Sequence, residues 1–272
     1  MKPNVMSAAL AAAVSGGVSA GEYMSGDFHN HTTCSDGSTN VEVLTEKSLS
    51  YLDWFIHVGH SGSGERDCRV SDFLYLNRDG AYNRGLWSNT IGDGPETDSD
   101  AIKGDFRDSE LRDGGRVERM WRWQSLQEYN LPGIVTAREL PGNEAKEAFL
   151  GLEWVVPGHE HSSNSIATGQ YLDAPNSDAI AQFEYCFSRN SDDTSGGGGQ
   201  GWTCEISDES NETLIALFEG RPEEGVADYN STLVGGINID DAGDHVKSTA
   251  AVLWMQENFP GAGFSVGAHV ER

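Results

Sequence analysis

Short apolar runs separated by a helical pattern open the chain. Residues 22–37 predict a strand that ends in a turn, and the apolar run 53–60 predicts a second strand. Between them, Thr39 and Glu42 have the spacing of a capping box, which predicts a helix that begins at Thr39. This order of strand, helix and strand is typical of a parallel β/α unit, in which ligands collect at the C-terminal ends of the strands.

Similar periodicities recur along the rest of the chain. They predict helices at 117–129, 178–187 and 246–257, and strands at 149–156, 165–171 and 263–269. The segment Leu131-Pro132-Gly133 is expected to end the first of these helices. Residues 61–115 are dominated by Gly, Asp, Ser and Asn, so we expect a long loop insertion there. The pattern therefore predicts the α/β class, with one main domain over residues 21–272.

An excess of acidic residues limits the partners of the protein. The chain of 272 residues has 18 Lys and Arg against 43 Asp and Glu, a formal net charge of −25. Such a surface repels phosphate backbones and anionic lipid, so neither nucleic acid nor a membrane surface is expected as a partner. A small anionic substrate remains compatible with this charge if bound metal ions supply local positive charge.

The N-terminus and the cysteines indicate a secreted or periplasmic protein. Residues 1–20 resemble a secretory signal peptide, and the alternative is a disordered tail. Cys186 and Cys204 flank a glycine-rich loop and could form a disulfide in an oxidising compartment. Cys34 and Cys68 could pair with each other, bind a metal or stay free.

Two His-x-His pairs carry the candidate chemistry. His29 and His31 alternate along a predicted extended segment, so both imidazoles project to one side and can bind one metal ion. His159 and His161 follow Glu153, a carboxylate inside an apolar run, where an unpaired charge would be costly. Imidazole and carboxylate together form a ligand set that suits zinc, iron or manganese.

Further candidate ligands stand near the ends of predicted strands. Asp36 belongs to the Ser-Asp-Gly turn that follows the first histidine pair, His60 ends the second strand, and His269 ends the last one. If these strands run parallel, their C-terminal ends meet at one edge of the sheet. We therefore expect these side chains to meet at one metal site.

Four of these segments resemble the motifs of the polymerase and histidinol phosphatase (PHP) family. Residues 27–37 resemble its opening motif, Asp-x-His-x-His-Ser/Thr-x-x-Ser-Asp-Gly, without a gap. Residues 52–60 resemble its second motif, with Val58-Gly59 where the family has Thr-Asp. Gly151-Leu152-Glu153 resembles the third motif, and Ala268-His269-Val270 resembles the fourth imperfectly. The later Asp-x-His pair of the family has no counterpart after His269, so we expect a barrel that is incomplete at its C-terminus.

The resemblance implies a distorted (β/α)7-like barrel with a site for two or three divalent metal ions at the C-terminal ends of its strands. His29 and His31 would bind one ion, and Asp36 and His60 would bind another. Glu153 would bridge the first ion to a further one. The ligands of that further ion would include His269 and either His159 or His161.

The activity implied by the resemblance is metal-dependent cleavage of phosphate esters by a metal-activated water, with catalytic roles for Asp36, His60 and Glu153. Arg66 or Arg272 could orient the phosphate group. The same kind of site also supports amide or lactone hydrolysis. An alternative that is not an enzyme is a secreted module that binds metal without catalysis. The remaining alternative is a nucleophilic cysteine at Cys34.

Overall fold

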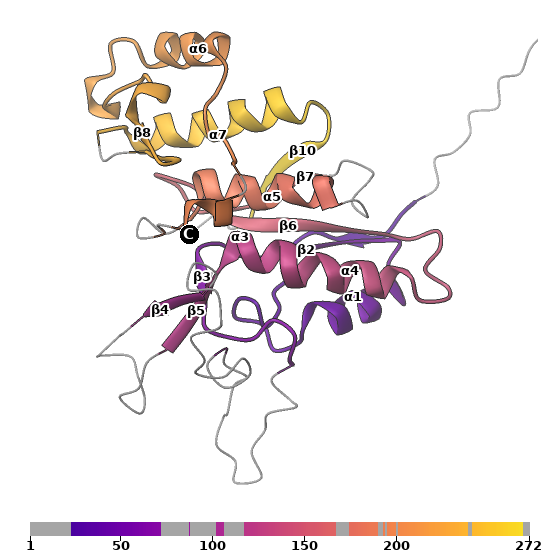
Figure 1. Ribbon diagram of the computed structural model, residues 1–272. Coiled ribbons are helices and arrows are strands. Elements are labelled where there is room, and N and C mark those ends of the chain that lie inside the picture. Colours follow the sequence, from indigo (N-terminus) through magenta and orange to yellow (C-terminus); the bar gives the residue numbers. More distant parts are fainter. Residues whose placement is uncertain are drawn as a thin grey trace, which may run out of the picture.

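A curled, half-barrel sheet of five strands forms the centre of the mixed α/β fold. The computed structural model (Figure 1) describes residues 23–71, 87, 102–105, 117–166, 174–189, 193, 195–199, 201–238 and 241–268. The strands of the sheet follow the order β1-β2-β6-β7-β10. Their bounds are β1 (Gly26–Asp27), β2 (Trp54–His60), β6 (Glu147–Val155), β7 (His161–Ile166) and β10 (Gly263–Gly267).

The direction of the strands changes in the middle of this sheet. β1, β2 and β6 pair in parallel, whereas β7 pairs antiparallel with both β6 and β10. Residues 156–160 alone connect β6 to β7, and so short a connection can only reverse the chain, because a parallel crossover needs a dozen residues or more. The expected (β/α)7-like barrel is therefore wrong, since such a barrel requires every strand to run parallel to the next.

Helices cover both faces of the sheet. In Figure 1, α1 (Val41–Leu49) and α4 (Leu131–Arg138) lie side by side against β2 and β6, and α5 (Ala174–Phe187) lies across the sheet from them. α7 (Asp244–Asn258) packs on α5, and α6 (Asp208–Phe218) packs on α7. The main core fills these layers with large apolar side chains that are at most 1 % exposed, among them Phe55, Leu152, Phe183, Leu214 and Trp254.

Smaller elements complete the described chain. β3 (Ser63–Gly64), β4 (Ile102–Asp105) and β5 (Val117–Trp121) form a three-stranded antiparallel sheet in the order β3-β5-β4. β8 (Leu233–Val234) and β9 (Ile237–Asn238) form a hairpin. The 3₁₀ helices are η3 (Gly196–Gly199), η4 (Pro222–Glu224) and η5 (Asn230–Thr232).

The helix predicted at 117–129 is partly wrong. β5 occupies its first five residues, and the helical backbone then runs through α3 (Arg122–Ser125), the π-helix η2 (Leu126–Asn130) and α4. Pro132 does not end this run. It lies in the first turn of α4, directly after the π-helix η2, whose last hydrogen bond runs from the Leu131 N–H to the Leu126 carbonyl oxygen.

The start of α1 also differs from the prediction. Asn40, rather than Thr39, is the N-cap, and its side chain accepts a hydrogen bond from the Val43 N–H at 2.9 Å. The helix therefore begins one residue later than predicted. Its first N–H groups have no backbone acceptor within the helix, and the Asn40 side chain supplies one.

Several sequence predictions lie outside the described residues. These are the signal peptide at 1–20, the greater part of the insertion at 61–115, the metal ligand His269 and the phosphate-binding candidate Arg272. Within the described part of the chain, no helix is both long enough and apolar enough to cross a lipid bilayer.

Candidate metal centre

The ends of four strands bring six candidate ligands to one edge of the sheet. His60 ends β2 and is the register partner of Glu153 on the parallel strand β6, so both lie at the same edge. β7 runs in the opposite direction and therefore begins at this edge, with His161 as its first residue. The six side chains are His29, His31, Asp36, His60, Glu153 and His161.

Glu153 lies at the centre of the cluster, and its side chain is fully buried. His60 Nδ1 is 2.7 Å from Glu153 Oε2, and His31 Nε2 is 3.4 Å from the same oxygen. On the other side, His29 Nε2 and His161 Nδ1 each lie 3.8 Å from Oε1. Four imidazoles from three segments of the chain thus surround one carboxylate.

Asp36 marks a second, more exposed part of the same cluster. Its Oδ1 lies 2.8 Å from His31 Nδ1, and its Oδ2 lies 3.6 Å from His60 Nε2. Two groups of three donors result: His29 with His31 and Glu153, and His31 with Asp36 and His60. Within each group the donor atoms lie within 4.8 Å of one another, a spacing that allows them to bind a single divalent ion.

The electrostatics of the cluster follow from this packing. Burial by itself raises the pKa of Glu153, but the hydrogen bond with His60 and the charges of His60, His31 and His29 outweigh it and lower the pKa to about 2. The hydrogen bond to Glu153 raises the pKa of His60, and burial lowers the pKa of His31. Glu153 is therefore a carboxylate at neutral pH, the form in which it can bind a cation.

The Ser-Asp-Gly turn that carries Asp36 is held from behind by Arg66. The buried Arg66 guanidinium donates hydrogen bonds to the carbonyl oxygens of Ser35 (3.1 Å to Nε) and Gly37 (2.6 Å to Nη1). A Cβ atom at Gly37 would lie 2.3 Å from the His31 carbonyl oxygen, so the close return of the chain requires glycine. The predicted role of Arg66 in orienting phosphate is replaced here by contacts with the turn.

Two serines orient the histidines, a role that the sequence did not predict. Ser163 Oγ lies 2.8 Å from His29 Nδ1, and Ser163 is the cross-strand partner of Glu153. Ser35 Oγ lies 3.2 Å from His31 Nδ1. Such contacts fix the orientation of an imidazole whose other nitrogen faces the metal. Serines are common in this chain, so nothing in the sequence distinguished these two.

A second missed group lies just behind the site. The buried carboxylate of Glu184 on α5 accepts hydrogen bonds from the N–H groups of Gly62 (2.9 Å) and Trp123 (3.0 Å). Burial raises the pKa of Glu184 to about 8, against the opposing effects of these donors and of the buried Arg122. Glu184 thereby ties the loop that follows His60 to the helix layer.

The structure separates the two histidines that the sequence left as alternatives. His161 joins the cluster, whereas the exposed His159 has its ring 4.9 Å from the ring of His245 on α7. Gly158 (φ +76°) turns the chain between β6 and β7, so the two histidines do not share the face that an extended segment would give them. Within the described part of the chain, the ring contact of His159 is with His245 and not with the cluster.

The cysteines form two disulfides, Cys34–Cys68 and Cys186–Cys204. The second is the pair that flanks the glycine-rich loop. The first excludes Cys34 as a nucleophile, because a disulfide sulfur has no thiolate to attack with.

Strand β2 passes close to the turn of Asp36 at Gly59. A Cβ atom at Gly59 would lie 3.0 Å from Ser35 Oγ and 3.5 Å from His57 Cε1. A side chain at this position would therefore require Ser35 Oγ to shift by a few tenths of an ångström.

Comparisons with known proteins add no family to this description. No protein-family model, no curated protein and no solved structure matches the chain. The metal site is therefore inferred from the fold and the geometry of this chain alone.

Proposed function

We propose that this protein is a metal-dependent hydrolase that cleaves phosphate esters with a water molecule activated at the six-residue cluster. The observation that carries the proposal is the convergence of four imidazoles on the buried Glu153 carboxylate. A buried charge of this kind is costly unless it is paired, and a divalent cation between the imidazoles and the carboxylate is a suitable partner.

The donor set fits two ions that share the cluster. His29, His31 and Glu153 would hold one ion at the buried end, and Asp36 and His60 would hold the other at the exposed end, with His31 within reach of both. Zinc, manganese and iron all accept this mixture of nitrogen and oxygen ligands. Bound ions of this kind polarise a phosphoryl oxygen and bring the pKa of a bound water towards neutrality.

The residues of the chain contribute position and charge to this chemistry. His161 lies 3.8 Å from Glu153 and supplies one further imidazole at the edge of the site. The buried Arg122 is close enough to act electrostatically on both Asp36 and His60. A cation at that place favours an anionic substrate in a protein whose net charge is −25.

Phosphate esters are chosen over amides and lactones for two reasons. The motifs at 27–37 and 52–60 resemble those of the PHP phosphoesterases, and the positive charge of the buried Arg122 acts on Asp36 and His60. The two disulfides are typical of an oxidising compartment, so we propose that the enzyme acts in the periplasm or outside the cell.

The test is turnover by protein that has been stripped of metal and reconstituted with zinc, manganese or iron(II). The expected result is release of 4-nitrophenol from 4-nitrophenyl phosphate that depends on the added metal. Glu153→Gln is expected to bind metal at least about 100-fold more weakly, because a neutral amide replaces the central carboxylate, and to lose turnover with it.

The matched control is Glu160→Gln, which removes an exposed carboxylate from the neighbouring β6–β7 loop. This variant is expected to keep both metal affinity and turnover. Metal binding without turnover of any phosphate ester would overturn the proposal of a hydrolase and favour a non-catalytic metal-binding module. Turnover restricted to amides or lactones would overturn the substrate class alone.

A further inference from the structure

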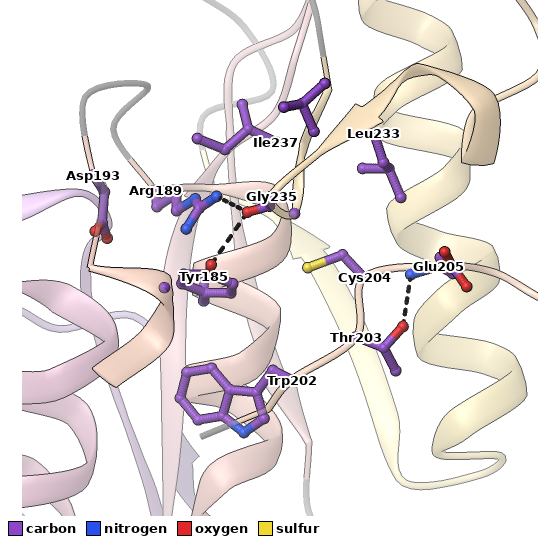
Figure 2. A pocket seen from close by; sticks show the side chains of 13 residues that line it. Tyr185, Arg189, Asp193, Trp202, Thr203, Cys204, Glu205, Leu233, Gly235 and Ile237 are labelled. Carbon is purple, nitrogen blue, oxygen red and sulfur yellow. Dashed lines mark hydrogen bonds between the residues drawn. The ribbon is translucent and has the colours of Figure 1, made fainter. Parts of the chain in front are cut away.

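A second pair of histidines lies outside the cluster, where the β6–β7 loop meets the start of α7. The ring centres of His159 and His245 are 4.9 Å apart, and the ring planes are inclined by 39°. The described lining of the cavity of about 580 Å³ between α5 and the β8–β9 hairpin includes neither histidine (Figure 2). His159 is exposed and the side chain of His245 is 45 % exposed, so both rings can be reached by a solute from the surface.

A tight turn holds His159 in place. Its N–H donates a hydrogen bond to the Val156 carbonyl oxygen at 2.9 Å. Proline at the second position of this turn and Gly158, with φ +76°, at the third are typical of a type II turn. A Cβ atom at Gly158 would lie 3.5 Å from His245 Nε2, so glycine also lets the turn lie close to the second ring.

Glu224 orients the ring of His245. Its Oε1 atom lies 2.7 Å from His245 Nδ1, and a carboxylate can only accept a hydrogen bond, so Nδ1 carries a proton and donates it. Nε2 is then the nitrogen that offers a lone pair in the neutral ring. Metal-binding histidines are commonly oriented in this way, by a carboxylate on the nitrogen that does not bind the ion.

The backbone keeps Glu224 beside α7. Gly225 and Ala242 form an antiparallel bridge directly next to it. A Cβ atom at Gly243 would lie 1.7 Å from the Glu224 carbonyl oxygen, so the two segments are in close contact where α7 begins. The carboxylate that orients His245 is therefore positioned by contacts between two segments of the fold.

The distance between the two rings fits a shared ion. With metal–nitrogen bonds of about 2.0–2.1 Å, two imidazoles on one ion have their ring centres about 4.5–5.2 Å apart. The rings of His29 and His31 in the cluster, at 5.1 Å, have nearly the same spacing. Exposed carboxylates follow His159 and precede His245 in the sequence, at Glu160 and Asp244, and they add negative charge that attracts a cation.

From these contacts we infer that His159 and His245 form a second metal site. It binds one transition-metal ion of the kind that imidazole suits, namely zinc, copper or nickel, and water completes the coordination. Two side chains hold this ion, so it binds more weakly than an ion in the cluster. The ion ties the β6–β7 loop to α7, and it binds whether or not the cluster is occupied.

The test is a zinc titration of metal-free protein in competition with a chromophoric chelator. His159→Ala and His245→Ala are each expected to bind one ion fewer than the wild type, because a single exposed imidazole does not retain zinc against the chelator. The ion of the second site is counted by this difference, so the count does not depend on how many ions the cluster binds. Glu153→Gln is expected to keep this ion, which separates the site from the cluster and from the proposed hydrolase.

Two neighbouring glutamates provide a matched pair of variants. Glu224→Gln removes the charge that orients His245 and is expected to weaken the binding of the second-site ion about 10- to 100-fold. Glu223→Gln removes an exposed carboxylate one residue away and is expected to leave the affinity unchanged. The thermal midpoint of each metal-free variant verifies folding, and added zinc is expected to raise the midpoint more in Glu223→Gln than in Glu224→Gln.

Two results would overturn the inference. The first is an equal number of bound ions in the wild type and in both folded histidine variants, which would leave packing of the rings as the sole reason for their contact. The second is an affinity for the second-site ion that is the same in Glu224→Gln as in Glu223→Gln, which would remove the carboxylate from the site.

Discussion

His57 makes the stability of this protein depend on pH in a way that can be worked out from its surroundings. It lies in the middle of β2 and is only 1 % exposed, with Nε2 3.1 Å from Asn130 Nδ2. A side-chain amide nitrogen can only donate, so His57 Nε2 accepts and Nδ1 carries the proton of the neutral ring. Protonation of His57 Nε2 would place its N–H group opposite the Asn130 amide N–H group in a buried site, with no acceptor between the two donors.

The size of the effect follows from the pKa. Burial, and after it the charges of Arg122 and His31, lower the pKa of His57 from 6.5 to about 3. Between these values the unfolded chain binds a proton at His57 that the folded protein does not bind, so folding stability falls as the pH falls. At pH 5 the loss is about 2 kcal/mol relative to neutral pH, and it approaches about 5 kcal/mol at the lower end of the window.

Urea unfolding at pH 7.5 and pH 5 measures this contribution. His57→Gln keeps an acceptor for Asn130 but cannot titrate, so the loss of unfolding free energy on acidification should be about 2 kcal/mol smaller in this variant than in the wild type. Equal pH dependence in the wild type and in His57→Gln would refute the reasoning.

Three further predictions concern the turn of Asp36, the packing of β6 on β7 and the second disulfide. Arg66→Gln removes the donors that hold the turn of Asp36, so metal affinity measured by chelator competition should fall about 10- to 100-fold, and an unchanged affinity would contradict this role. Gly151→Ala would place a Cβ atom 2.7 Å from a carbonyl oxygen of β7, so urea unfolding should show a loss of about 1–3 kcal/mol, whereas an unchanged midpoint would show that the strands can separate freely. Replacing both Cys186 and Cys204 by serine opens a loop of sequence separation 18, for which calorimetry should show a loss of about 3 kcal/mol; full retention of stability would count against an entropic contribution.

The sequence predicted the elements that have strong local signals. β2, β6 and α7 were expected within a few residues of where they lie, because a sustained apolar run or a helical period marks each of them. Residues 117–121 show why the local signal fails elsewhere. Their apolar positions fit a helix as well as a strand, and pairing with β3 and β4 made them the strand β5.

The reversal of the chain after β6 was the decisive feature that the sequence did not reveal. Gly158 and its neighbours form a tight turn, so β7 runs antiparallel and the sheet does not continue as a barrel. Because of the same turn, His161 lies in the cluster and His159 lies against His245 of α7. Alternation along the chain could not separate the two histidines, because residues two apart share a face only while the backbone stays extended.

The amino-acid sequence by itself determined which side chains could carry chemistry: the imidazoles and carboxylates of residues 27–37, His60 and Glu153. Their positions relative to strand ends follow from local periodicity, which acts over a few residues and is therefore readable in the sequence. The tertiary structure alone decided which of them meet and how Ser163 and Arg66 hold them. These outcomes depend on strand direction and on contacts between residues far apart in the chain, and no local pattern encodes either of them.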